Sequence, residues 1–459
     1  MSRKEQAQKL IETFRHRNID RVKLGGFDID GVLRGKYVSL DKFESAVTSG
    51  FGFCDVIFGW DSADELYEDA GVTVTGWHTG YPDTNCIIDL DSLRYIPWED
   101  NQPLFLVDFL APDGSPLDVS PRQLAQRIVA KAEAMGFIAK TSAEFEFWVF
   151  RETPDSVREK DYRNMNSLTP GMFGYSCIRA SQNRPFFNDM FTGMKAFGIP
   201  LEGLHTETGP GVLEAAITYD SLLQSADNGA LFKTATKEIS YQHGLMSTFM
   251  AKWKQSLPGS SGHLHQSLWT MDGRPAFYDE NDPLKMSSTF KHYVAGVMHT
   301  LPEFTALYAP TINSYRRLVP GMWAPTRACW APENRTASLR TIHTPKPSSS
   351  RMELRVTGAD INPYIATAAG VAAGLWGIEN QLELPEPASG NAYTLPESVA
   401  PPLPATLEEA SARLRESSIA RGLFGDTFVN HYCATRDWEV RQFRQAVTDW
   451  ELSRYFEII

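Results

Sequence analysis

Three short segments of the chain alternate ionisable side chains with apolar ones. Their ionisable residues are Glu144 and Glu146, His263 and His265, and Arg351, Glu353 and Arg355. Alternate side chains of a β-strand point to the same face, so each set would share one face while its apolar neighbours enter a core. The expected core residues are Phe145, Phe147, Leu264, Met352 and Leu354. One such segment is compatible with a solvated face, but three predict a polar sheet face that lines a cavity for cations and anions.

Six residues have the chemistry of ligands for divalent cations. They are Glu144, Glu146, Glu207, Glu214, His263 and Glu353. Five carboxylates and one imidazole favour Mg²⁺ or Mn²⁺ over zinc, which prefers more sulfur or nitrogen. Glu207 and Glu214 flank a Thr-Gly-Pro-Gly run, whose turn-forming residues could fold both carboxylates toward one point. Each pair taken alone is more often an exposed strand face or a loop.

A second set of candidate binding residues is cationic. Its members are Arg317, Arg335, Arg340, Arg351 and Arg355. Guanidinium groups match the oxygens of phosphate and carboxylate groups in a bidentate manner, although a solvated basic surface is the simpler alternative. Metal-binding carboxylates opposite arginines describe a site that neutralises a polyphosphate and a second anionic substrate. The sequence has no P-loop and no kinase-like glycine loop, so a nucleotide would be held by another device.

The composition is that of a soluble globular protein with two domains. Of 459 residues, 42% are hydrophobic and 22% charged, and the formal charge of -12 argues against nucleic acid or an anionic membrane as the main partner. The longest apolar run, residues 365–378, is too short to span a bilayer. The five cysteines are scattered without a CxxC pair, and the polar N-terminus resembles no secretory signal. We therefore expect a cytoplasmic protein.

The first part of the chain predicts a small unit that mixes strands with a helix. Residues 2–17 have the pattern of an amphipathic helix. Residues 22–38 alternate around Asp30-Gly31, a strong signal for a hairpin turn. The strand-like runs 86–90 and 104–109 continue this region.

A second, larger unit begins with a helix. Ser120 is the expected N-cap and Pro121 the first helical residue, so we place the domain boundary near residues 112–120. Farther along, Thr406 and Glu409 predict a helix that opens with a capping box.

Six blocks of the chain, in order, resemble the signature blocks of the glutamine synthetase superfamily, type I-like branch. They are Glu144-x-Glu146, Glu207-(x)₆-Glu214, and residues 259–267, 313–321, 334–340 and 351–355. The block Asn-Ser-Tyr-Arg-Arg-Leu-Val-Pro-Gly at 313–321 is highly specific to that family. The resemblance runs from about residue 20 to residues 450–455 near the C-terminus.

The resemblance implies an α+β fold with two domains. Residues 1–115 would form a small N-terminal β-grasp domain, and residues 116–459 a large catalytic domain that binds ATP and glutamate. The catalytic domain would curl an antiparallel sheet into a funnel surrounded by helices. The resemblance also implies ring-shaped homo-oligomers, either single hexamers or stacked dodecamers, in which a neighbour's N-terminal domain completes each site.

Carried over position by position, the resemblance gives each candidate residue a role. One metal ion would be held by Glu146, Glu207 and Glu214, and a second, beside the ATP phosphates, by Glu144, His263 and Glu353. The implied cofactors are ATP as co-substrate and two or three Mg²⁺ or Mn²⁺ ions. The implied nucleotide-binding residues are His265, Ser267, Arg340, Arg351 and Arg335, the last against the γ-phosphoryl group. The implied glutamate-binding residues are Glu146, Gly259, His263, Arg317 and Arg355.

The implied reaction joins glutamate to an amine in two steps. The γ-carboxylate of glutamate attacks the γ-phosphorus of ATP to give an acyl phosphate, and a neutral amine then displaces the phosphate. Metal ions and arginines stabilise charge on the transferring phosphoryl group. The implied catalytic residues are Arg317, Arg335 and Asp55, the last as an acid that faces the amine.

The chain departs from the family pattern where the amine should bind. Ammonia-using members carry a glutamate at the position of Trp323, and that glutamate binds ammonium and takes its proton. An indole cannot act as a base, but its ring face can bind a cation and its body can contact an apolar substituent. Asp55 and Phe58 occupy the block that the family contributes from the neighbouring subunit. We therefore predict a glutamate–amine ligase whose amine pocket contains Trp323, Asp55 and Phe58.

Three alternatives remain open from the sequence. A true glutamine synthetase, with Asp55 or another acid as its base, predicts ammonium as the best nucleophile. A non-catalytic structural homologue would be expected to lack metal ligands, and none is missing. A ligase for an acid other than glutamate is disfavoured by Arg317 and Arg355. Tyr393 matches a position that some family members adenylylate, but we predict no regulation there.

Overall fold

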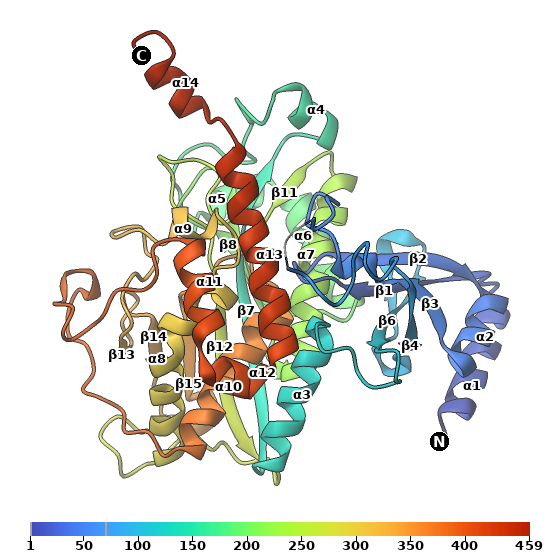
Figure 1. Cartoon of the computed structure of the whole chain (residues 1–459), viewed down its shortest axis with the longest axis horizontal. Helices are drawn as coiled ribbons and strands as arrows, with labels where there is room; N and C mark the ends of the chain where they lie inside the picture. Colours follow the sequence, from blue (N-terminus) through green and yellow to red (C-terminus); the bar gives the residue numbers. More distant parts are fainter. Residues whose placement is uncertain (1, 69–70) are drawn as a thin grey trace.

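The N-terminal part of the chain folds as a mixed sheet with two helices against one face (Figure 1). Its elements are α1 (Arg3–His16), β1 (Arg21–Phe27), β2 (Leu33–Ser39), α2 (Leu40–Ser49), β3 (Phe51–Cys54), β4 (Asp83–Ile88), β5 (Arg94–Ile96) and β6 (Gln102–Leu110). The strand order is β2-β1-β6-β4-β3, with β5 also on β6, and within this sheet the described strands β1 and β6 pair in parallel while the other pairs are antiparallel. The computed structural model describes residues 2–68 and 71–459. Residues 1 and 69–70, within the predicted N-terminal domain, lie outside the described residues.

The second part of the chain builds a larger, mostly antiparallel sheet. Its strands are β7 (Phe137–Phe150), β8 (Leu201–Thr206), β9 (Val212–Ile217), β10 (Asp220–Ser221), β11 (Met246–Thr248), β12 (Gly262–Thr270), β13 (Trp330–Pro332), β14 (Leu339–Ile342) and β15 (Arg351–Leu354). They run in the order β13-β14-β15-β12-β7-β9-β8, and β10 and β11 pair with the two ends of the long β7. This order places β7, β12 and β15, the three segments with alternating side chains, next to one another.

Helices cover one side of this sheet and leave the other side to the site (Figure 1). The helices of this part of the chain are α3 (Pro121–Ala134), α4 (Pro154–Glu159), α5 (Cys177–Gln182), α6 (Arg184–Ala196), α7 (Leu222–Gln242), α8 (Ser288–Tyr308), α9 (Ser314–Arg317), α10 (Pro363–Glu379), α11 (Leu407–Glu416), α12 (Ser418–Phe424), α13 (Asp426–Gln445) and α14 (Asp449–Tyr455), of which α14 lies away from the sheet. The Ala- and Gly-rich α10 packs closely on α8, where a Cβ on Gly377 would lie 2.6 Å from the Cα of Gly296. Among the described residues, none of the helices combines the length and the apolar character needed to cross a bilayer.

The alternating segments bury the apolar side chains that the sequence predicts. The expected core residues are all at most 1% exposed: Phe145, Phe147, Leu264, Met352 and Leu354. Phe145 stacks on Phe232 of α7, with ring centroids 6.1 Å apart. The α+β prediction is confirmed, and the opposite, polar faces of the same strands are free to line a cavity.

Most of the helix and hairpin predictions are confirmed, with one difference in detail. The predicted helix at residues 2–17 is α1, and the predicted hairpin at residues 22–38 is β1 with β2. Thr406 caps α11 by accepting a hydrogen bond from the backbone of Glu409. The side chain of Glu409 instead accepts from the backbone N–H of Ala405, so the second half of the predicted capping box is wrong by one residue.

Buried ion pairs fix the N-terminal part against the larger part. Arg122, at the start of α3, lies within 2.9 Å of carboxylate oxygens of Asp89, Asp108 and Asp227, which come from both parts. The boundary proposed from the sequence, between residues 115 and 116, falls in the connection between β6 and α3. Removing one partner of a buried ion pair leaves an uncompensated charge, so this junction resists separation.

Candidate active site

The register of three strands, β7, β12 and β15, brings predicted residues together. On β7, Glu144 lies opposite His263 of β12. Farther along the sheet, Glu353 of β15 lies opposite His265 of β12. Directly opposed residues of an antiparallel pair have Cβ atoms about 5 Å apart, so side chains on the same face can touch. The alternation seen in the sequence therefore becomes a patch of carboxylates and imidazoles on one face of the sheet.

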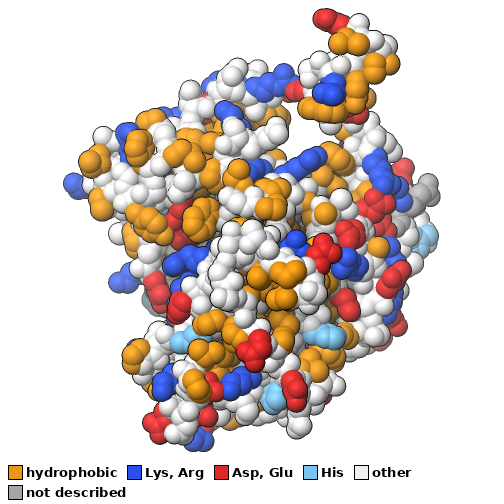
Figure 2. Space-filling view, turned by 90° about the vertical axis from the view of Figure 1, so that its left-hand side faces the viewer, with side chains coloured by type: hydrophobic (Ala, Val, Ile, Leu, Met, Phe, Trp, Pro, Cys, Tyr) orange, Lys and Arg blue, Asp and Glu red, His pale blue; other side chains and the backbone are white. Residues whose placement is uncertain are grey.

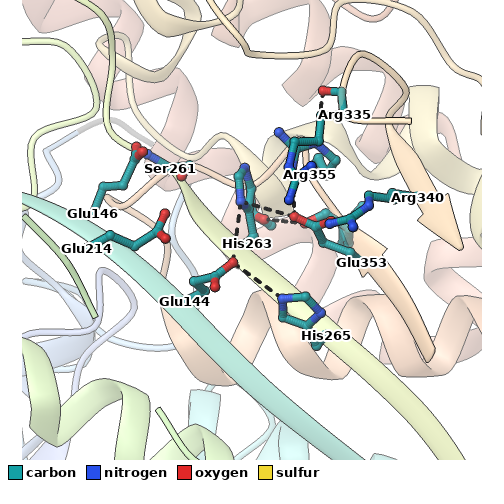
Figure 3. Close-up of polar contacts among 12 residues, drawn as sticks. Glu144, Glu146, Glu214, Ser261, His263, His265, Arg335, Arg340, Glu353 and Arg355 are labelled. Carbon is teal, nitrogen blue, oxygen red and sulfur yellow. Dashed lines mark hydrogen bonds and ion pairs between the residues drawn. The ribbon is translucent and has the colours of Figure 1, made fainter. Parts of the chain in front are cut away.

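One group of possible metal ligands lies at the centre of this patch (Figure 3). The Nδ1 atom of His263 is 3.3 Å from a carboxylate oxygen of Glu353 and 4.0 Å from one of Glu144. The Nε2 atom of His265 is 3.4 Å from the same oxygen of Glu144. Ligand atoms of Glu144, His265 and Glu353 lie within 4.8 Å of one another. Both histidines thus lie beside Glu144 and Glu353, the carboxylates predicted to hold the second metal ion. That His263 binds this ion and His265 the nucleotide stays a prediction.

A second group of possible ligands lies on β8 and β9. His205 Nε2 is 3.0 Å from Glu207 and 3.3 Å from Glu214, and these three residues form a compact cluster. The ring of Tyr175 stacks on His205, with ring centroids 4.5 Å apart. Glu146, the third predicted ligand of this metal, lies opposite Glu214 in the register and accepts a hydrogen bond from the backbone of Ser261.

The donor set fits hard divalent cations. Burial and then the neighbouring carboxylates of Glu144, Glu146, Glu207 and Glu353 raise the pKa of Glu214 to about 10. Such crowding of like charges is what a bound divalent cation relieves. Burial and the charge of Arg355 also hold the pKa of His263 well below its usual range, so its ring is neutral, as a metal ligand must be. The Nε2 atom of this ring is buried without a hydrogen-bond partner.

Arginines form the wall beside Glu353. Arg355 NH1 lies 2.5 Å and Arg340 NH1 3.0 Å from its carboxylate oxygens. Burial disfavours its charge, but the charges of Arg355 and Arg340 oppose burial, and the pKa of Glu353 lies well below its usual range. Arg351 donates from Nε to Nδ1 of His265 at 3.2 Å. Glu353 is therefore an ionised carboxylate that lies between the arginines and the other possible metal ligands.

Arg317 lies in the part of the site that the resemblance assigns to glutamate. Its side chain is buried and donates to the backbone carbonyl oxygens of Val356 and Arg355, at 2.9 and 3.2 Å. Burial lowers its pKa to about 10, so it remains charged near neutral pH. A Cβ on Gly259 would lie 2.6 Å from Cγ of Arg317, so this close approach requires glycine.

A single cavity of about 890 Å³ joins these groups. All the residues predicted to bind metal, nucleotide or glutamate line it, and so does Trp323. At one end, Lys140 Nζ lies 3.9 Å from the ring centroid of Trp269, whose indole N–H donates to Ser267. This volume is in the range of small-molecule sites and accommodates a nucleotide together with an amino acid.

The predicted amine-pocket residues are separated in the single chain. Trp323 lines the cavity beside Met322, is 63% exposed and has a backbone φ of +61°. Asp55 lies in the N-terminal part, outside the cavity lining, and its carboxylate accepts a hydrogen bond from Thr75 at 2.7 Å. The prediction for Phe58 is wrong: it is 0% exposed and packs edge-on against Phe109 in the N-terminal core. A ring committed to that core cannot contact an amine.

Three residues of the site were missed by the sequence analysis. His205 on β8 and Glu207 just after this strand are two residues apart, the same spacing that identified the other segments. Tyr175 follows an irregular loop and carries no local pattern. Glu333 contacts Arg340, although the two are separated by a turn, and no spacing rule indicates that contact.

Comparison with known proteins gives a consistent result. A family model described as "Glutamine synthetase, catalytic domain" matches residues 118–455. "Type-1 glutamine synthetase 2" of Dictyostelium discoideum is 49% identical over 441 residues, covering 95% of this chain and 84% of the relative. "Glutamate--isopropylamine ligase" of a Pseudomonas species is 39% identical over 457 residues, covering 99% of each chain.

Two further similarities complete this comparison. "Gamma-glutamylethanolamide synthetase GlnA4" of Streptomyces coelicolor is 37% identical over 441 residues, covering 96% of this chain and 93% of the relative. The solved structure of a GmaS/ADP complex has a TM-score of 0.84 and 26% identity, covering 97% of this chain and 99% of the other.

Proposed function

Because this chain belongs to the glutamine synthetase family, we propose that it joins the γ-carboxylate of L-glutamate to an organic amine in a reaction driven by ATP. The family uses ATP and divalent metal ions. Two separate clusters of possible ligands support at least two ions here, held by Glu144, His263 and Glu353 and by Glu207 and Glu214 with Glu146. When bound, such ions polarise phosphoryl oxygens and offset the charge of the carboxylates.

The observation that carries the amine assignment is the position of Trp323. It lines the cavity and is largely exposed, so its ring is available to a ligand. At this position the resemblance implies a glutamate in ammonia-using members. An indole face attracts a cation by about 0.5–2 kcal/mol, and its body favours an amine that carries a hydrocarbon part over ammonium. Two relatives are named as ligases of organic amines, and they support the same assignment.

In this proposal, arginines that line the cavity stabilise the phosphoryl group during the first step. Arg335, Arg340 and Arg351 line the cavity and would donate to phosphate oxygens as the γ-carboxylate oxygen of glutamate bonds to phosphorus and ADP leaves. The buried Arg317 is held by backbone carbonyl groups and keeps a fixed charge for a substrate carboxylate.

The second step needs a neutral amine. Its nitrogen bonds to the acyl carbon, phosphate leaves with one carboxyl oxygen, and the amine loses a proton. Trp323 has no basic group, so this proton must pass to a carboxylate, to the leaving phosphate or to solvent, and an amine that binds as a cation must first lose another. Asp55 of a neighbouring subunit is our candidate acceptor, because burial raises its pKa above the usual value.

A true glutamine synthetase is the second candidate function. The Dictyostelium relative, at 49% identity, carries that name. In this alternative ammonium is the better substrate, and Asp55 or another acid binds it and takes its proton. The two candidates share every step except the identity of the nucleophile.

The reaction itself is tested by isotope transfer. With both γ-carboxyl oxygens of glutamate labelled with ¹⁸O, an alkylamine and Mg²⁺, we expect each phosphate released to carry one labelled oxygen, because phosphate leaves with a carboxyl oxygen. Mass spectrometry of the phosphate and of the γ-glutamyl amide measures both products. Unlabelled phosphate would show plain ATP hydrolysis and contradict the acyl-phosphate route.

We also propose that the chain self-associates into hexameric rings, stacked through its C-terminus. Helix α14 projects from the body, and its segment displays apolar side chains (Figure 1 and Figure 2). The exposed apolar residues are Val447, Trp450, Leu452, Tyr455, Phe456, Ile458 and Ile459. Light scattering should give a mass of six or twelve subunits, and deletion of residues 447–459 should lower a dodecamer to a hexamer. A monomeric mass for the full-length or the truncated protein would contradict the proposal.

A further inference from the structure

Arg340 is held by two carboxylates on opposite sides. Its NH1 atom lies 3.0 Å from Glu353 and its NH2 atom 2.6 Å from Glu333. Its Nε atom is buried without a hydrogen-bond partner, and the guanidinium lines the cavity. Glu353 belongs to the site already described. Glu333 does not line the cavity, so an effect of Glu333 on a ligand there must pass through Arg340.

The carboxylate of Glu353 cannot keep all its present contacts if it also binds a metal ion during the reaction. Arg355, Arg340 and His263 all lie within 3.3 Å of its two oxygens. A divalent cation bound to Glu353 would compete with these contacts, and the phosphates of a nucleotide would attract both arginines. Arg355 has another anchor, since its Nε donates to the carbonyl oxygen of Arg335. The remaining anchor of Arg340 is Glu333.

The carboxylate of Glu333 is itself fixed in place. One oxygen accepts from the backbone N–H of His343 at 3.2 Å, and the other accepts from Arg340. Its own backbone N–H donates to the carbonyl of Thr341 at 3.0 Å. Burial disfavours its charge, but the hydrogen bond from Arg340 outweighs burial and the pKa of Glu333 lies below its usual value.

The backbone of Glu333 adopts a conformation that favours glycine. Its φ is +51°, a region that residues with a Cβ seldom occupy. Such conformations persist where the surrounding structure enforces them, and they are concentrated at functional sites. A surface ion pair alone would not explain the strain, because Glu333 is 48% exposed and exposed pairs contribute little to stability.

From this geometry we propose that Glu333 is a positioning residue, which keeps the guanidinium of Arg340 at the phosphate end of the cavity when Glu353 engages its cation. The inference rests on the proposed function, because it needs a nucleotide in this cavity. It adds to that function one residue that lies outside the cavity and contacts none of the three substrates. Loss of the partner that orients a metal-ligating side chain typically lowers affinity or activity by about 10–100-fold, and for the partner of an arginine we expect an effect at the lower end of that range.

Nucleotide binding gives the direct test. The Kd of the β,γ-imido analogue of ATP with Mg²⁺ is measured by calorimetry for wild type, Glu333→Gln, Arg340→Ala and the double variant. We expect Glu333→Gln to raise Kd about tenfold alone and to have no further effect in the Arg340→Ala background. Residues that act through one another show this non-additivity, whereas independent effects add. Equal Kd values for Glu333→Gln and wild type, or additive effects, overturn the proposal.

Two further variants separate positioning from folding. Glu397→Gln is the matched control, because Glu397 is an exposed partner of Arg327 at 3.8 Å, and its Kd should equal that of wild type. Glu333→Gly removes the carboxylate and relieves the positive φ, so its Tm should stay level or rise while its Kd still increases. A Tm that falls in step with binding would indicate a structural role and contradict the proposal.

The same experiment distinguishes this inference from the proposed function. If wild type binds no Mg²⁺-nucleotide, the proposed function fails and the inference fails with it. If wild type and Arg340→Ala differ in Kd while Glu333→Gln matches wild type, the function stands and only the role of Glu333 is lost. In steady-state assays, the KM for ATP should rise and the KM for glutamate should not.

Discussion

Glu353→Gln should lower glutamate-dependent phosphate release from ATP by at least about a thousandfold. The carboxylate is 1% exposed and receives Arg340, Arg355 and His263. Glutamine has the same shape but no charge, so it weakens a metal site and leaves two arginines without their shared counter-ion. Single groups that stabilise charge in a transferring phosphoryl group are worth about 10³-fold or more.

This prediction needs a check on folding, because truncating a buried ion pair also destabilises. Phosphate release is measured with saturating glutamate, an alkylamine and Mg²⁺, beside Glu383→Gln, which replaces an exposed glutamate. Thermal unfolding and gel filtration report whether the variant retains its fold. A folded Glu353→Gln enzyme with turnover within tenfold of wild type would contradict the role assigned to this residue.

Trp323→Glu should change the preference between ammonium and an organic amine by about a hundredfold. The new carboxylate attracts ammonium and can take its proton, while loss of the indole removes about 0.5–2 kcal/mol of cation–π binding. We expect kcat/KM for ammonium to rise about tenfold and that for the amine to fall about tenfold. The φ of +61° is unfavourable for either side chain, so backbone strain does not favour one variant.

Two matched variants separate charge from shape at this position. Trp323→Gln has the size of the glutamate variant without its charge, and it should lose amine preference without gaining ammonium turnover. Trp323→Phe keeps a ring and should retain most of the amine preference. If the ratio of the two rates is the same in Trp323→Glu and wild type, Trp323 does not determine the nucleophile.

Much of the site follows from local alternation. The faces of β7, β12 and β15 are set by the two-residue period, so the sequence predicts which side chains are buried and which face a cavity. The distances between side chains on different strands depend instead on the register of strand pairing. That His263 lies opposite Glu144, and His265 opposite Glu353, results from pairing between strands more than a hundred or about ninety residues apart. Here the family resemblance supplied what the local pattern could not.

The errors have the same physical origin. Phe58 lies in a short 3-10 turn, Asp55–Phe58, and packing against Phe109 decides that it points inward. The carboxylate of Glu409 accepts a hydrogen bond from the backbone N–H of Ala405 and not from that of the N-cap residue Thr406, which is the next donor along the chain. Glu333 has a positive φ, and its partner Arg340 lies on β14, the strand that pairs with β13 just before Glu333. Each depends on tertiary contacts that no short window of sequence contains.

The central claim is that this member of the family uses an organic amine. The measurement is a competition in one reaction, with wild-type protein, ATP, Mg²⁺, L-glutamate and equal concentrations of ammonium and one amine from an alkyl, aromatic or polyamine panel. Mass spectrometry gives the ratio of γ-glutamyl amide to glutamine, which equals the ratio of kcat/KM values. We expect at least one organic amine to exceed ammonium by tenfold or more. Glutamine as the main product against every amine would contradict it and would establish a glutamine synthetase.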